Sequence, residues 1–183
     1  MNLSHTLRAS LAAALGGLLC QAAAAADWRP AGAFIQGGVG EHAQSVTVGA
    51  IWPWEWRRVA RGEWTAQTEV FVSHWRGDAF GGGSQGFTQV GITPMLRLRF
   101  DEGRSPWFVE AGIGLTLLDK DYRTPHRQFS TRFNFIDTLA VGRNFGARGE
   151  HELSLRAVHV SNADIKKPNP GEDFLQLRYA TRF

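Results

Sequence analysis

Residues 107–118 read Trp-Phe-Val-Glu-Ala-Gly-Ile-Gly-Leu-Thr-Leu-Leu. The odd-numbered positions of this stretch are all apolar, whereas most of the even-numbered positions are Glu, Gly or Thr. A period of two is that of a β-strand, because successive side chains of a strand point to opposite faces. We therefore predict a strand with one apolar and one polar face, long enough to cross a bilayer when it is tilted.

The same period recurs along the rest of the chain. Counting a glycine-rich first strand near residues 31–41, eight such segments follow one another, and none has a convincing helical period. Short turns at 101–104 and 146–149 alternate with long polar connections near 76–86, 119–130 and 162–172. This layout predicts an all-β fold, an eight-stranded antiparallel up-and-down β-barrel.

Composition narrows the class of protein. The chain has 183 residues, a formal net charge of +3 and one Cys, so neither a nucleic-acid-binding arm nor a disulfide framework is indicated. Residues 1–26 combine Arg8, an apolar run and small residues before Asp27, which is the layout of a cleaved signal peptide; a retained anchor is the alternative. We expect the barrel domain to comprise residues 27–183, without Cys20 and thus without thiol chemistry.

A barrel with alternating strands can be a soluble transporter with its apolar face inward, or a membrane barrel with that face toward lipid. Three features favour the membrane barrel. Two strands, near 86–100 and 105–118, are long enough to span a bilayer, and the chain ends on Phe183, as bacterial outer-membrane barrels do. Tryptophans lie near predicted strand ends, as interfacial girdles require: Trp52, Trp54, Trp56, Trp64, Trp75 and Trp107. We predict a transmembrane barrel in the bacterial outer membrane.

One strand carries polar residues on its apolar row. His159 and Ser161 continue the lipid-facing row, and residues two apart in a strand lie about 6.5–7 Å apart on one side. That arrangement suits a hydroxyl nucleophile and its base, and a triad also needs an acid. In the next strand, Asp173 lies on the same face as His159 and Ser161 and is the preferred acid. Glu172 faces the lumen and could serve as the acid only if a bulge turned it outward, so it is kept as the alternative. Without a catalytic role, the pair would be polar residues of a strand end bonded to loop backbone.

The remaining histidines give no signal of a metal site. We expect His74, at the junction of strand and loop, and His126, in a Pro-containing loop, to be unremarkable, because neither has a partner at metal-ligand spacing. No metal-binding or nucleotide-binding motif is present, so no metal or organic cofactor is implied.

The run His159-Val160-Ser161-Asn162-Ala163, followed by Pro168-Asn169 and Gly171, resembles the lipid A 3-O-deacylases (PagL) of Gram-negative outer membranes. The resemblance implies an outward-facing triad with Ser161 as nucleophile and His159 as general base. Asp173 stands where the family usually has Glu. The resemblance also implies an oxyanion hole formed by Asn162 and the backbone N–H at Asp164, where the family has Gly.

The resulting hypothesis is a serine esterase that removes the 3-O-linked acyl chain from lipid A, with its site toward the outer leaflet. Its expected partners are lipopolysaccharide and outer-membrane lipids, without nucleic acid, and the barrel is expected to be a monomer or homodimer. Basic residues near the long loops are candidates for pairing with lipid A phosphates: Arg76, Arg123, Arg127, Lys166 and Lys167. The chief alternative is a structural or adhesive barrel without activity; a lipid A acyltransferase and a soluble transporter come after it.

Overall fold

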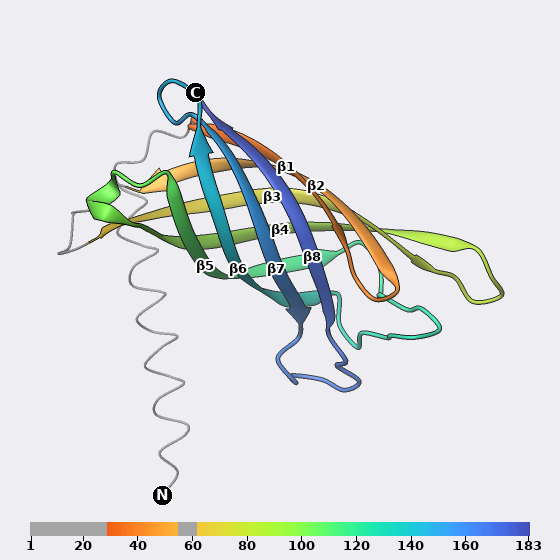
Figure 1. Cartoon of the computed structure of the whole chain (residues 1–183). Helices are drawn as coiled ribbons and strands as arrows, with labels where there is room; N and C mark the ends of the chain where they lie inside the picture. Colours follow the sequence, from red (N-terminus) through yellow and green to blue (C-terminus); the bar gives the residue numbers. More distant parts are fainter. Residues whose placement is uncertain (1–28, 55–61) are drawn as a thin grey trace, which may run out of the picture.

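Eight antiparallel strands, in which polar and apolar side chains alternate, lie side by side in one closed barrel (Figure 1). The computed structural model describes residues 29–54 and 62–183, so the predicted signal peptide and Trp56 lie outside the described residues. The strands are β1 (Gly32–Val39), β2 (Ala43–Trp54), β3 (Glu63–Asp78), β4 (Ser84–Arg99), β5 (Trp107–Leu118), β6 (Phe133–Phe145), β7 (His151–Ser161) and β8 (Glu172–Arg182).

Each strand pairs with the next along the chain, and β8 pairs back onto β1 from Gly32↔Arg182 to Val39↔Leu175. The predicted fold is thereby confirmed. A single short 3-10 turn, η1 (Asp101–Gly103), interrupts the strands within the described residues. Among the same residues, no helix has the length and hydropathy needed to cross a membrane.

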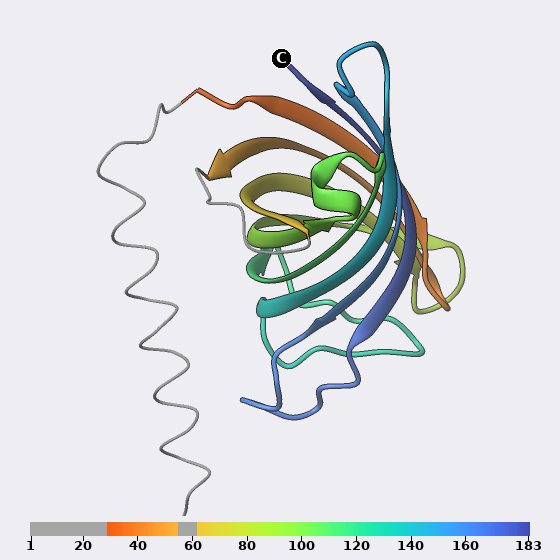
Figure 2. The same ribbon diagram turned by 60° about the vertical axis from the view of Figure 1, so that its left-hand side comes forward.

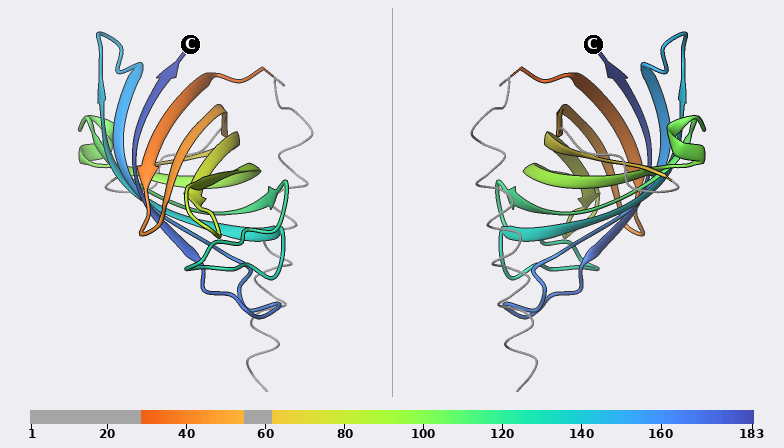
Figure 3. Two further views of the ribbon diagram at one scale, coloured as in Figure 1. Left: turned by 90° about the vertical axis from the view of Figure 1, so that its right-hand side faces the viewer. Right: turned by 90° about the vertical axis from the view of Figure 1, so that its left-hand side faces the viewer.

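The two ends of the barrel differ (Figures 1 and 3). The C-terminus, η1 and the turn between β6 and β7 lie at one end, and the β5–β6 and β7–β8 connections lie at the other. The connection predicted at 76–86 is shorter than expected, because β3 runs on to Asp78 and β4 begins at Ser84. His74 therefore lies within β3 and not at a loop junction.

Charged side chains fill the lumen. Three carboxylates along the strands, those of Glu69, Glu110 and Glu152, each accept hydrogen bonds from at least two arginines within the described residues. The closest pairs are bidentate, with Arg97 to Glu152 at 2.6 and 2.7 Å and Arg156 to Glu69 at 2.8 Å twice. Mutual pairing is what allows charges to be buried at all.

The same strands curve around the lumen (Figure 2), and their outward-facing side chains are apolar. Half-exposed aliphatic residues of this outer face include Val48, Val72, Ile92, Leu115, Leu139, Leu155 and Leu177. Apolar residues outside and charges inside are the arrangement of a membrane barrel and the reverse of a soluble transporter.

One member of the predicted tryptophan girdle is misplaced. Trp107 is 51% exposed at the start of β5, as expected, but Trp75 is only 2% exposed. Trp75 occupies an inward position of β3 and packs against Tyr122 and Phe174, with ring centroids 5.5 and 4.8 Å away. The prediction was wrong for Trp75 because proximity to a strand end does not reveal which face the side chain takes.

Candidate active site

His159 and Asp173 are directly opposite each other in the pairing of β7 with β8. Directly opposite residues of an antiparallel pair share one face of the sheet. Here the imidazole Nδ1 lies 2.6 Å from a carboxylate oxygen of Asp173, on the outer face of the barrel. Both side chains are partly open, with 43% of His159 and 72% of Asp173 exposed.

Ser161 lies two residues beyond His159 at the end of β7, opposite Phe135 of β6. It is only 9% exposed, and no hydrogen bond joins its hydroxyl to His159 in the described part of the chain. When Nδ1–H of His159 is donated to Asp173, Nε2 carries the lone pair that can accept the Ser161 proton. Catalytic hydrogen bonds are often long in unliganded enzymes and shorten only when substrate binds.

Gly171 holds the imidazole from the loop side. A Cβ atom at this position would lie 2.5 Å from Cε1 of His159, and the backbone has φ of +70°. Only glycine fits both the close approach and the left-handed conformation. The β7–β8 connection therefore restricts the orientation of the His159 ring.

Glu172 points the other way. It is fully buried and accepts a hydrogen bond of 2.9 Å from the Tyr122 hydroxyl inside the barrel mouth. Burial, together with the Glu172 carboxylate, raises the pKa of Tyr122 well above its ordinary value. The regular pairing of β7 with β8 leaves no bulge that would bring Glu172 to His159.

The segment after Ser161 is a tight turn, closed by the Ile165 N–H donating to the Asn162 carbonyl at 3.1 Å. Ala163 and Asp164 both have positive φ, 53° and 60°, as in a type I′ turn. Asp164 thus adopts the left-handed conformation that suits Gly, and its N–H forms no hydrogen bond among the described residues.

Asn162 is bound into the loop through all of its donors. Its backbone N–H donates to Asn169 at 2.9 Å, and its side-chain amide donates to Ser130 and to the Lys166 carbonyl. Of the two groups expected to stabilise an oxyanion, the Asp164 N–H is free in the described structure, and the Asn162 donors are occupied. The oxyanion role of both residues stays a prediction.

The basic residues near the loops fall into two groups. Arg127 binds Glu41 at 2.6 Å and the Gly171 carbonyl at 3.0 Å, and Arg76 and Arg123 bind Ser84 and Asp121. The hydrogen bond from Arg127 holds the pKa of Glu41 below its ordinary value. Within the described residues, Lys166 and Lys167 form no ion pair.

Reasoning from sequence missed one cluster. His126 was expected to be unremarkable, yet it lies beside His42 and Asp78. The three residues come from two different connections and from the end of β3, so spacing along the chain gave no signal of their proximity.

Known proteins resemble this chain along most of its length. The family model described as lipid A 3-O-deacylase (PagL) matches residues 41–182. The lipid A deacylase PagL of Bordetella bronchiseptica is 33% identical over 171 residues, which are 90% of this chain and 92% of the relative. The corresponding protein of Pseudomonas aeruginosa is 28% identical over 145 residues, covering 78% and 80% of the two chains. The crystal structure of the outer membrane enzyme PagL matches with a TM-score of 0.67 at 26% identity, covering 82% of this chain and 99% of that one.

Proposed function

Since the chain belongs to the lipid A 3-O-deacylase (PagL) family, we propose that it removes the 3-O-linked acyl chain from lipid A with a triad of Ser161, His159 and Asp173. Family membership makes the chain a hydrolase of ester bonds and places its barrel in the outer membrane. The observation that carries the triad is the 2.6 Å contact between His159 and Asp173, with Ser161 two residues further along the same outward row.

The proposed reaction has two steps. Nε2 of His159 takes the Ser161 proton as the hydroxyl oxygen attacks the ester carbonyl, and the N–H of Asp164 stabilises the oxyanion. The C–O bond to the sugar then breaks, and the sugar oxygen receives the proton from His159. Water, deprotonated by His159, cleaves the acyl-enzyme, releases the acyl chain as a carboxylic acid and regenerates Ser161. Asp173 orients the ring and stabilises its cationic form.

An apolar groove next to the site supports a lipid substrate. It has a volume of about 700 Å³, runs over the outer surface of β2–β5 and ends at Phe133. The Phe133 ring contacts that of Phe135, with centroids 5.5 Å apart, and Phe135 is the cross-strand partner of Ser161. An acyl chain in this groove would bring its ester end toward Ser161, and Lys166 and Lys167 would lie on the loop side, where phosphates of the lipid A headgroup can reach them.

The position in the membrane follows from the same geometry. The chain termini of outer-membrane barrels lie on the periplasmic side, where the turns are short. The opposite end, with the β7–β8 loop and Ser161, would then lie at the depth of the outer leaflet. We propose that the site opens toward that leaflet, and that a monomer or homodimer suffices because all three triad residues come from one chain.

Mass spectrometry of lipid A from expressing cells tests the proposal. Wild type should remove one 3-linked acyl chain, and Ser161→Ala should leave lipid A intact. Ser154→Ala is the matched control, since Ser154 belongs to the same strand but faces the lumen. The assay is repeated in detergent extract, so that inactivity in the native membrane is not mistaken for lack of an active site. Unmodified lipid A in both assays, with a folded barrel, would favour a structural or adhesive protein.

A further inference from the structure

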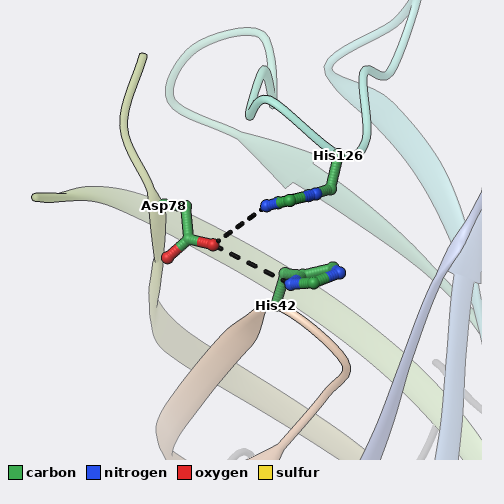
Figure 4. A group of neighbouring side chains, drawn as sticks. All are labelled: His42, Asp78 and His126. Carbon is green, nitrogen blue, oxygen red and sulfur yellow. Dashed lines mark ion pairs between the residues drawn. The ribbon is translucent and has the colours of Figure 1, made fainter. Parts of the chain in front are cut away.

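Two histidines and one aspartate that are not part of the proposed triad meet at the long-loop end of the barrel (Figure 4). His42 lies in the β1–β2 turn, Asp78 ends β3, and His126 belongs to the β5–β6 connection. One potential ligand atom from each lies within 4.8 Å of the others. No step of the proposed hydrolysis uses any of them.

The distances match those of a metal site. The Asp78 carboxylate oxygen lies 3.3 Å from Nε2 of His126 and 3.8 Å from Nδ1 of His42. Two ligands of a tetrahedral zinc ion, each about 2.0–2.2 Å from the metal, are roughly 3.3–3.5 Å apart. The pair of Asp78 and His126 already has this separation, and the 3.8 Å between Asp78 and Nδ1 of His42 exceeds it by a few tenths of an ångström.

The imidazole rings are stacked, with centroids 3.6 Å apart and planes at 12°. Both rings direct a nitrogen toward the same Asp78 oxygen (Figure 4). The contacts of 3.3 and 3.8 Å are longer than usual N–H···O hydrogen bonds, and they are ion pairs only when the imidazoles are protonated. Binding one ion would tilt the rings out of the stack, because each lone pair lies in its ring plane.

A carboxylate also lies behind the first ring. Nε2 of His42 is 3.9 Å from Glu41, and Glu41 is held by Arg127 at 2.6 Å. Histidines that bind a metal through one nitrogen commonly direct the other toward a carboxylate, which fixes the ring and raises its basicity. Glu41 is placed for that supporting role toward His42.

We propose that His42, Asp78 and His126 bind one Zn²⁺ ion, or a similar divalent transition cation, at the mouth of the barrel. Two imidazoles with one carboxylate suit Zn²⁺ better than Ca²⁺ or Mg²⁺, which prefer all-oxygen ligands. The fourth position remains open for water or an anionic oxygen. The ion would join the β1–β2 turn, the end of β3 and the β5–β6 connection, which the backbone links only through the strands.

The site also has a mechanical link to the β7–β8 loop. Arg127 follows His126 directly, and its guanidinium donates to the carbonyls of Pro170 and Gly171. Fixing His126 therefore fixes the residue that supports this loop. We expect zinc to raise the thermal stability of the folded barrel and to slow proteolysis within residues 119–132.

The test is a titration of ZnCl₂ into the full barrel, purified in detergent without a histidine tag and stripped of metal. Calorimetry should give one equivalent for wild type, and His42→Ala with His126→Ala should weaken binding at least about 100-fold. Asp78→Asn, which keeps the size of the side chain, should weaken it by about tenfold or more. His151→Ala is the matched control, because His151 also lies 3.9 Å from a carboxylate, that of Glu150, at the other end of the barrel.

Co²⁺ in place of Zn²⁺ reports the geometry, since tetrahedral cobalt absorbs visible light far more strongly than hexahydrated cobalt. The strong bands should appear with wild type and His151→Ala and be lost in the double variant. Heat-modifiable mobility on gels verifies that each variant is folded. One-to-one zinc binding by the double variant with wild-type affinity, or no binding by wild type, overturns the proposal.

Discussion

The lumen and the outer face of β7 both carry ionisable side chains, but they use them in opposite ways. In the lumen, Glu152 accepts from Arg97, Arg178 and Arg182, and it is fully buried. On the outer face, His159 pairs with Asp173 alone among the described residues, and both side chains remain partly open. The lumen carboxylates are surrounded by partners, whereas Nε2 of His159 keeps its lone pair when Nδ1 donates its proton to Asp173.

This difference separates structural from reactive polar groups. A buried charge that several partners surround loses much stability if one partner is removed, and it has no capacity left for a substrate. A histidine that is oriented on one side and free on the other contributes little to folding and can transfer a proton. Substitutions in the two regions should therefore affect different measurements.

The largest effect is expected from Asp173→Asn. An amide cannot stabilise the imidazolium, so kcat should fall roughly 10³–10⁴-fold, as for the loss of the acid in other triads, with the unfolding transition unchanged. The measurement is release of the acyl chain from purified lipid A in detergent. Glu172→Gln is the matched control and should keep most of the activity, since Glu172 faces Tyr122. The opposite outcome would identify Glu172 as the acid.

The reverse pattern is expected from Glu152→Gln. Removing this negative charge leaves the buried positive charges of Arg97 and Arg178 only partly neutralised. The free energy of unfolding should therefore fall by about 3–5 kcal/mol. Urea unfolding in lipid vesicles measures this, and activity per folded molecule should stay at the wild-type value. Glu150→Gln, in the turn before β7, should change stability by less than about 0.5 kcal/mol. An equal loss in both variants would argue against a structural role for the lumen network.

Gly171→Ala tests how sharply the loop orients His159. The new methyl group would overlap the ring, so kcat should fall about tenfold to a hundredfold, with a smaller change in KM. Gly82→Ala separates contact from backbone strain, because Gly82 also has positive φ, +98°, but open space around it. If both substitutions leave activity intact, the contact with Gly171 does not position the ring.

The smallest effect is expected from Asp164→Gly. Glycine adopts the left-handed conformation of this turn without the steric cost that a Cβ atom brings, so stability should rise by about 0.5–1 kcal/mol. Thermal unfolding measures the gain, and Ala163→Gly, at the neighbouring position of positive φ, should behave alike. A loss of stability in both would mean that the side chains hold the turn, for example through the contact of Asp164 with Asn169 at 3.4 Å.

Sequence analysis reached the barrel because its signal is local and repeated. A period of two assigns each side chain to a face, and every additional strand supports the same assignment. The same parity assigned Glu172 to the lumen and Asp173 to the face of His159, as the structure has them. It could not reveal that the Asn162 donors are occupied, because their partners Ser130 and Asn169 lie in other parts of the loops.

The sequence by itself determined the strand number, the period of two that separates the two faces of each strand, and the row shared by His159 and Ser161. Only the tertiary structure decided which side chains meet where strands end. Gly171 packed against His159, and His42 and His126 of two connections came together with Asp78 at the end of β3. The physical reason is that the strand period ends with the strand. The loops follow no regular repeat, so the distances between them depend on how the barrel closes.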